Sequence, residues 1–180
     1  MQIVFTHHAH RDTSKGRAQD NPISADGRAD AKILGEILGK NKVPVTCIYQ
    51  GEYLRYTQTV EMLNRLLKVP VYIDKRLNEG SLTAEEAAQT IGAASYVISR
   101  KEEEKRIHEF LSDLIAKHEN TDIIICNTSG VSLNWFITYF LKGTPIKGFR
   151  YAGMAGTVGS VIFEYDKLQK KPYIANETKG

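Results

Sequence analysis

The sequence predicts an α/β sandwich with a largely parallel sheet, because short apolar runs alternate along the chain with segments of helical periodicity. The chain has 180 residues, which suffices for one domain, and it contains no internal repeat and no Pro/Gly/Ser-rich linker. Its 42% hydrophobic and 25% charged residues are typical of a globular protein with a substantial core. We therefore expect a single domain over residues 1–180.

The strands and helices are expected in alternating order. Strands are predicted at 2–6, 45–49, 70–73, 122–126 and 158–165. Helices are predicted at 24–39, 52–68 and 131–141, and after the capping-box patterns that begin at Thr83 and Ser99. The segment 122–126 is rich in β-branched residues, which favours a central strand that is buried on both faces.

Apolar residues at helical spacing predict the buried face of three helices. They are Ile33, Leu34, Ile37 and Leu38 in the first, Val60, Leu63 and Leu67 in the second, and Ile107, Phe110, Leu111, Leu114 and Ile115 in the helix after Ser99.

Charge and cysteine content limit the function classes. The net charge is +3 and the basic residues form no concentrated patch, so nucleic-acid binding is not expected. Cys47 and Cys126 lie in apolar, strand-like segments and are expected to be buried free thiols. The N-terminus lacks a signal-peptide pattern, and no apolar run approaches ~18 residues. We therefore expect a cytoplasmic protein without membrane contact.

Two predicted strand ends carry polar residues typical of a binding site. Thr6 leads into His7-His8-Ala9-His10, and Cys126 leads into Asn127-Thr128-Ser129-Gly130 before a helix. Ligands of open α/β sheets bind beyond the carboxyl ends of the strands. A helix N-terminus also directs backbone N–H groups at an anion. We expect both turns to face one anion site.

Several motifs in this order resemble the histidine phosphatase (phosphoglycerate mutase-like) superfamily. The segments 6–9 and 22–31 resemble its Arg-His-Gly or Arg-His-Ala signature and the start of its first helix, and 48–59 resembles its Ser-Ser-x-Leu-x-Arg-x-x-Gln-Thr segment. The segments 76–79, 124–131 and 159–165 are similar to its Leu-x-Glu segment, its Ser-His-Gly-Gly-Val strand end and its closing strand. The resemblance implies a three-layer α/β/α sandwich of the phosphoglycerate mutase-like type, with a mostly parallel sheet and no cofactor.

The resemblance also implies a chemistry. In that family a histidine attacks a phosphoryl group and becomes a phosphohistidine, which water or a second substrate discharges. By position, His8 matches this nucleophile, Arg55 an arginine that binds the phosphoryl oxygens, and Glu79 the proton donor to the leaving oxygen. The implied partner is a phosphorylated small molecule or inorganic phosphate. The oligomeric state is left open.

Two positions depart from the family pattern. His7 stands where the first arginine is expected, and Thr128 stands where a second histidine is expected. A hydroxyl carries no charge, and an imidazole with the reference pKa of ~6.5 is mostly neutral at pH 7. Losing one preorganised donor to a developing anion costs ~10²–10³ in rate.

We therefore expect weakened phosphomonoester hydrolysis through His8, with phosphate held by His7, Arg55, Thr128 and Ser129. Activity is expected in a narrow, mildly acidic range, where His7 gains charge while His8 must stay neutral. The alternative is a non-catalytic protein of the same fold that binds an anionic metabolite or a protein partner.

A zinc site is a weaker alternative. His8, His10 and Asp12 resemble the His-x-His-x-Asp cluster of metallo-β-lactamase-like hydrolases, and these residue types are suitable zinc ligands. That family places its motif after several strands and supplies more histidines downstream. Here only His108 and His118 remain, both on a predicted surface helix, so no metal is expected.

Overall fold

The computed structural model describes residues 1–14, 21–78, 100–130, 132–133, 149–155 and 160–165. Six strands form one sheet in the order β3-β2-β4-β1-β6-β5. They are β1 (Gln2–His7), β2 (Val45–Gln50), β3 (Val71–Ile73), β4 (Ile123–Thr128), β5 (Phe149–Ala155) and β6 (Ser160–Tyr165). The pairings among β3, β2, β4 and β1 are parallel, whereas β6 pairs antiparallel with both β1 and β5. The prediction of a mostly parallel sheet is confirmed.

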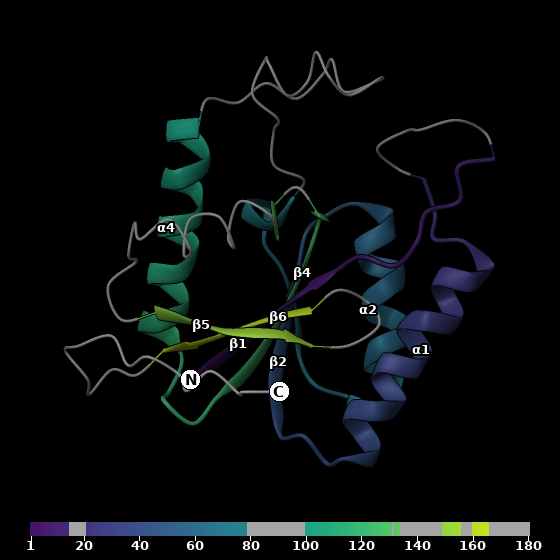
Figure 1. Cartoon of the computed structure of the whole chain (residues 1–180), viewed down its shortest axis with the longest axis horizontal. Helices are drawn as coiled ribbons and strands as arrows, with labels where there is room; N and C mark the ends of the chain where they lie inside the picture. Colours follow the sequence, from purple (N-terminus) through teal and green to yellow (C-terminus); the bar gives the residue numbers. More distant parts are fainter. Residues whose placement is uncertain (15–20, 79–99, 131, 134–148, 156–159, 166–180) are drawn as a thin grey trace.

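Helices cover both faces of the sheet. The helices α1 (Ala25–Lys40) and α2 (Leu54–Leu67) lie on one side, and α4 (Arg100–Lys117) lies on the other (Figure 1). A short 3₁₀ helix, η1 (Lys75–Leu77), follows β3. The predicted three-layer α/β/α arrangement is therefore confirmed for the described residues.

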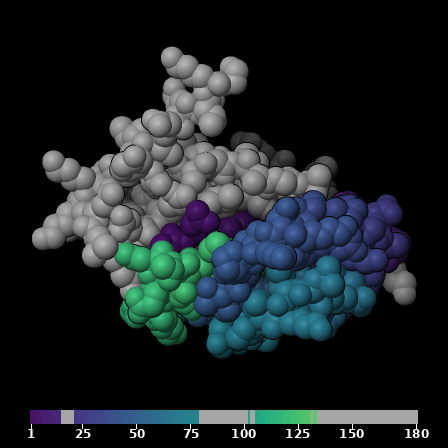
Figure 2. Space-filling model, turned by 90° about the horizontal axis from the view of Figure 1, so that it is seen from below, coloured from purple at the N-terminus to yellow at the C-terminus, as the bar shows by residue number. Residues whose placement is uncertain are grey.

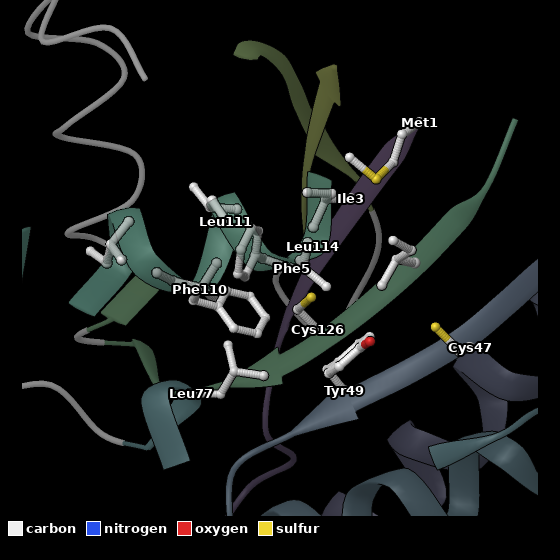
Figure 3. Close-up of a cluster of buried hydrophobic side chains, with 13 residues drawn as sticks. Met1, Ile3, Phe5, Cys47, Tyr49, Leu77, Phe110, Leu111, Leu114 and Cys126 are labelled. Atoms are coloured by element: carbon white, nitrogen blue, oxygen red, sulfur yellow. The ribbon is translucent and has the colours of Figure 1, made fainter. Parts of the chain in front are cut away.

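Two apolar clusters fill the spaces between these layers. Alternate residues of β1 point to opposite faces, so Ile3 and Phe5 join the cluster beneath α4, whereas Val4 packs on the α1 and α2 side. Phe110, Leu111 and Leu114 of α4 contact the first cluster (Figure 3). Fully burying a side chain of this size contributes roughly 1.5–3 kcal/mol. The sheet that carries the site is therefore held from both sides.

The buried face of α1 differs from the predicted one. Ser24 caps the helix as expected, because its Oγ accepts a hydrogen bond of 3.0 Å from the Gly27 N–H. However, Ile33 and Ile37 are 47% and 46% exposed. The expectation that these two isoleucines are buried is wrong.

The reason is a close approach of two helices (Figure 2). A Cβ atom added to Gly35 would lie 2.4 Å from the Leu63 carbonyl oxygen, so α1 can meet α2 only through a residue without a side chain. This contact turns Ala31 and Gly35 inward, with Leu34 and Leu38 partly buried beside them.

Other expectations have mixed outcomes. The apolar faces predicted for α2 and α4 are confirmed, and both cysteines are buried and free. Strand β5 was not predicted, because its C-terminal Ala-Gly-Met-Ala run lacks β-branched residues. The Thr83 capping box, Ser99 and residues 134–141 lie outside the described residues.

His118 is not a surface residue of α4 as the sequence suggested. It lies one residue beyond α4 and is largely buried. Its Nε2 lies 3.0 Å from the Tyr49 hydroxyl and its Nδ1 lies 3.0 Å from an Asp122 carboxylate oxygen. No helix among the described residues combines the length and apolarity needed to cross a membrane.

We expect Gly35→Ala to lower the free energy of unfolding by roughly 1–3 kcal/mol, because the added methyl group meets rigid backbone atoms of Leu63. Gly39→Ala is the matched control, because its new methyl group meets only the side chain of Leu66, at 3.3 Å and beyond. The control should be neutral or stabilising by up to about 1 kcal/mol, since alanine favours helix over glycine. Urea unfolding measures both. A Gly35→Ala variant as stable as the wild type would contradict the close helix contact.

Candidate functional site

The ends of β1 and β4 lie side by side at the same edge of the sheet. Their parallel pairing continues to His7 opposite Thr128. Beyond the last pair, the His8 N–H donates to the Thr128 carbonyl oxygen at 2.9 Å. A Cβ on Gly130 would lie 3.1 Å from the His7 ring, so the second turn passes close to this imidazole. The two turns therefore meet at this edge of the sheet.

His8 is buried, and its tautomer follows from one hydrogen bond. Its Nδ1 lies 2.8 Å from the Ala9 carbonyl oxygen. Because a carbonyl oxygen only accepts, the ring proton must sit on Nδ1, which leaves the lone pair on Nε2. A histidine that attacks an electrophile through Nε2 requires this state.

The surroundings of His8 also keep it neutral. The pKa of His8 is lowered from 6.5 to about 2, chiefly by burial and then by the neighbouring His7, with smaller contributions from Arg55 and Arg11. The hydrogen bond to Ala9 acts in the opposite direction. The ring therefore remains neutral across the whole physiological pH range.

Arg55 lies in the first turn of α2 and is fully buried. Its guanidinium carbon lies 4.8 Å from the ring centre of Tyr53 and 4.7 Å from that of Tyr56. Its Nη2 donates to the Tyr56 hydroxyl at 3.2 Å. The His8 ring packs against the same Tyr56, with ring centres 5.6 Å apart. The structure thus brings His8 and Arg55 to one tyrosine.

The Gln-Thr pair of the α2 motif fixes the loop after β1. The Thr59 hydroxyl accepts from the Ala9 N–H at 3.0 Å and donates to the Arg55 carbonyl oxygen at 2.6 Å. The Gln58 side chain accepts from the Ile23 N–H at 2.9 Å. One turn of α2 therefore fixes the backbone next to His8.

Thr128 and Ser129 use their hydroxyl groups within the protein. Thr128 Oγ1 donates to the Leu77 carbonyl oxygen at 2.7 Å. Ser129 Oγ accepts from the Ser132 N–H and donates to the Ser132 hydroxyl, both at 3.2 Å, so Ser129 caps the helix that begins at Gly130. The phosphate-binding role predicted for these two side chains has no support from these contacts. Glu79 lies outside the described residues.

The zinc alternative does not fit the structure. Among the described residues, no group of three His, Cys, Asp or Glu side chains is placed to hold a metal ion. His8 directs Nδ1 to Ala9 and packs on Tyr56, His10 is exposed, and Asp12 Oδ1 accepts from the Ser14 N–H. The three predicted ligands therefore do not converge, and the zinc interpretation is wrong.

Sequence reasoning missed the tyrosines of this site. Tyr53 and Tyr56 flank Arg55, and the signal was their aromatic character on both sides of the motif arginine. The sequence placed Asn127 in the turn of the expected site but did not show its role, which is to donate from its side-chain nitrogen to the Thr6 hydroxyl at 2.8 Å and so join the two strand ends.

The sequence pattern of the histidine phosphatase superfamily (branch 1) matches residues 3–177. The chain therefore belongs to this superfamily, and the fold implied by the resemblance is confirmed. No curated protein matches the sequence.

Solved structures share the fold. Bacillus stearothermophilus YhfR is 24% identical with a TM-score of 0.68, and the match covers 92% of each chain. A mycobacterial glucosyl-3-phosphoglycerate phosphatase in complex with VO3 is 21% identical with a TM-score of 0.65, over 92% of this chain and 96% of that one. The protein histidine phosphatase SixA in complex with tungstate is 13% identical with a TM-score of 0.56, over 78% and 76%. At these identities the likeness shows the fold alone.

The pKa of His8 predicts a stability effect. Because its folded-state pKa lies far below 6.5, the unfolded chain binds the proton first, and stability falls as the pH drops below about 6.5. We expect a loss of roughly 2 kcal/mol between pH 7 and pH 5, at about 1.4 kcal/mol per pH unit. His8→Asn should lack this contribution, since its side-chain amide can still donate to Ala9 without titrating.

Urea unfolding of both proteins at pH 7 and pH 5 measures the effect, because the difference between the two proteins cancels all other titrating groups. Equal pH dependence in the wild type and His8→Asn would show that His8 is not held neutral.

Proposed function

We propose that this protein hydrolyses phosphomonoesters slowly, through a phosphohistidine formed at His8. The observation that carries the proposal is the buried imidazole whose only ring proton is held on Nδ1 by Ala9, which leaves Nε2 as a neutral nucleophile. Membership of the histidine phosphatase superfamily supports the proposal, as do the VO3 and tungstate complexes of proteins with the same fold.

The proposed reaction has two displacements. The Nε2 lone pair of His8 forms an N–P bond while the bond from phosphorus to the ester oxygen breaks, and that oxygen takes a proton, for which Glu79 is the proposed donor. A water molecule then forms a P–O bond while the N–P bond breaks, and the proton that the water loses passes to the Glu79 carboxylate left by the first step as inorganic phosphate leaves. Arg55 stabilises the negative oxygens in both steps, and Arg11 adds positive potential near His8.

Turnover is expected to be slow because the site has few cationic donors for the phosphoryl oxygens. The His7 imidazole is not a permanent cation as an arginine would be, and the Thr128 hydroxyl is directed to Leu77. Two donors expected in the family are therefore weakened or turned away. The same observation favours a second candidate, a non-catalytic protein that binds an anionic metabolite at His8 and Arg55.

Hydrolysis of p-nitrophenyl phosphate between pH 5 and pH 8, with His8→Ala as the control, distinguishes the two candidates. The phosphatase predicts His8-dependent turnover and an acid-labile, alkali-stable phosphoprotein after rapid quenching with a labelled substrate. The binding protein predicts a higher melting temperature with inorganic phosphate and no turnover. If the protein shows no turnover and its melting temperature does not change with phosphate, both candidates are rejected.

His7→Arg should raise kcat/KM, because it places a permanent cation beside the nucleophile. We expect a gain of ~10²-fold at pH 8. The ratio of variant to wild type cancels the titration of the substrate. No gain at pH 8 would contradict the proposed role of position 7.

The low pKa of His8 also changes the expected pH profile. The narrow optimum predicted from the sequence assumed that His8 protonates near the same pH as His7. Because burial keeps His8 neutral down to acidic pH, its protonation should not reduce kcat/KM above about pH 4.

Arg55→Lys should lower kcat/KM at least about tenfold, because a lysine keeps the charge but loses the planar fork and its stacking on two rings. Arg65→Lys is the matched control, since Arg65 is exposed at the end of the same helix and should retain wild-type activity. Equal kcat/KM values for the two variants would exclude Arg55 from phosphoryl binding.

A further inference from the structure

Tyr56 contacts both residues to which the proposed function assigns phosphoryl chemistry. It occupies an unspecified position of the family motif and is fully buried near the start of α2. The His8 ring meets the Tyr56 ring at an interplanar angle of 63°, and the Arg55 guanidinium lies over the Tyr56 ring at 4.7 Å. The Arg55 Nη2 also donates to the Tyr56 hydroxyl. One side chain therefore touches both groups.

The tyrosine ring is itself tightly placed. A Cβ on Gly51 would lie 2.5 Å from Tyr56 Cε2 and 2.6 Å from Cδ2, so the ring fills the space over this glycine. The Tyr53 ring stacks against it with ring centres 5.7 Å apart. Because the ring cannot shift without displacing its neighbours, it can act as a rigid spacer.

Stacking is a suitable way to hold this arginine in an anion site. An aromatic face stabilises a guanidinium through its π electrons, whereas the N–H donors of the guanidinium lie in its own plane. A carboxylate in the same place would compete with a phosphoryl group for those donors. The two tyrosine faces therefore stabilise the Arg55 cation without presenting a rival anion.

We propose that Tyr56 is a positioning residue, whose ring and hydroxyl fix His8 and Arg55 at the separation that lets both meet one phosphoryl group. This inference rests on the proposed function of His8. The expected effect is large, because a misplacement of about 1 Å in a catalytic arrangement can cost ~10²-fold in rate.

The test compares Tyr56→Phe and Tyr56→Leu with the wild type. The readouts are kcat and KM for p-nitrophenyl phosphate and the Kd of orthovanadate, measured on protein shown to be folded by circular dichroism. We expect Tyr56→Phe, which retains the ring, to lower kcat and weaken orthovanadate binding three- to tenfold. We expect Tyr56→Leu, which removes both contacts, to lower kcat by ~10²-fold. Phe110→Leu, which truncates a buried ring on the opposite face of the sheet, should reduce stability and leave kcat within twofold.

Each outcome supports or overturns the inference. Values of kcat and Kd within twofold of wild type for both tyrosine variants would overturn it while the proposed function stands. If Tyr56→Leu does not fold, unchanged values for Tyr56→Phe are decisive against it. A wild-type protein that neither turns over the substrate in a His8-dependent way nor binds orthovanadate would instead overturn the proposed function, and with it the role of Tyr56.

Discussion

A fully buried guanidinium is the constraint around which this site is arranged. Removing a charge from water is costly unless partners replace the hydration. At Arg55 those partners include the rings of Tyr53 and Tyr56 and the Tyr56 hydroxyl. The ring of Tyr56 also packs against His8. Thr59 ties the Arg55 backbone to Ala9, which in turn holds the His8 proton. His8 and Arg55 are therefore parts of one packed unit built from β1 and α2, rather than two independently mobile side chains.

The scaffold explains why residues so distant in sequence can cooperate. The parallel pairing of β1 with β4 brings the His7-His8 turn beside the Thr128-to-Gly130 turn, and the helices on both faces hold these strands in the core. The hydroxyls of the second turn stabilise the fold locally, at Leu77 and at the start of a helix. The Thr128 side chain therefore serves here as a structural contact.

The layers of the fold and the meeting of the two strand ends were predictable from the sequence. The predictions that were wrong, and the residues that were missed, have physical causes. Alternating apolar runs and helical periods predicted the layers, and the position of binding turns beyond the carboxyl ends of parallel strands predicted that the turns after the first and fourth strands lie together. Periodicity alone could not select the buried face of α1, because the contact of Gly35 with Leu63 depends on how α1 packs against α2. The position of Tyr56 was likewise invisible, since its contacts with His8 and Arg55 exist only after α2 packs against β1. Thr128 was expected to bind phosphate from its place in the turn, whereas the hydrogen bond that directs its hydroxyl to Leu77 depends on η1.

The central claim is that His8 and Arg55 engage one phosphoryl group. A crystal structure of the protein with orthovanadate tests it most directly, because vanadium adopts the geometry of a phosphoryl group in transfer. The account predicts vanadium bonded to His8 Nε2, with Arg55 donating to the oxyanion oxygens. Vanadate bound elsewhere, or bound without contact to both side chains, would contradict it.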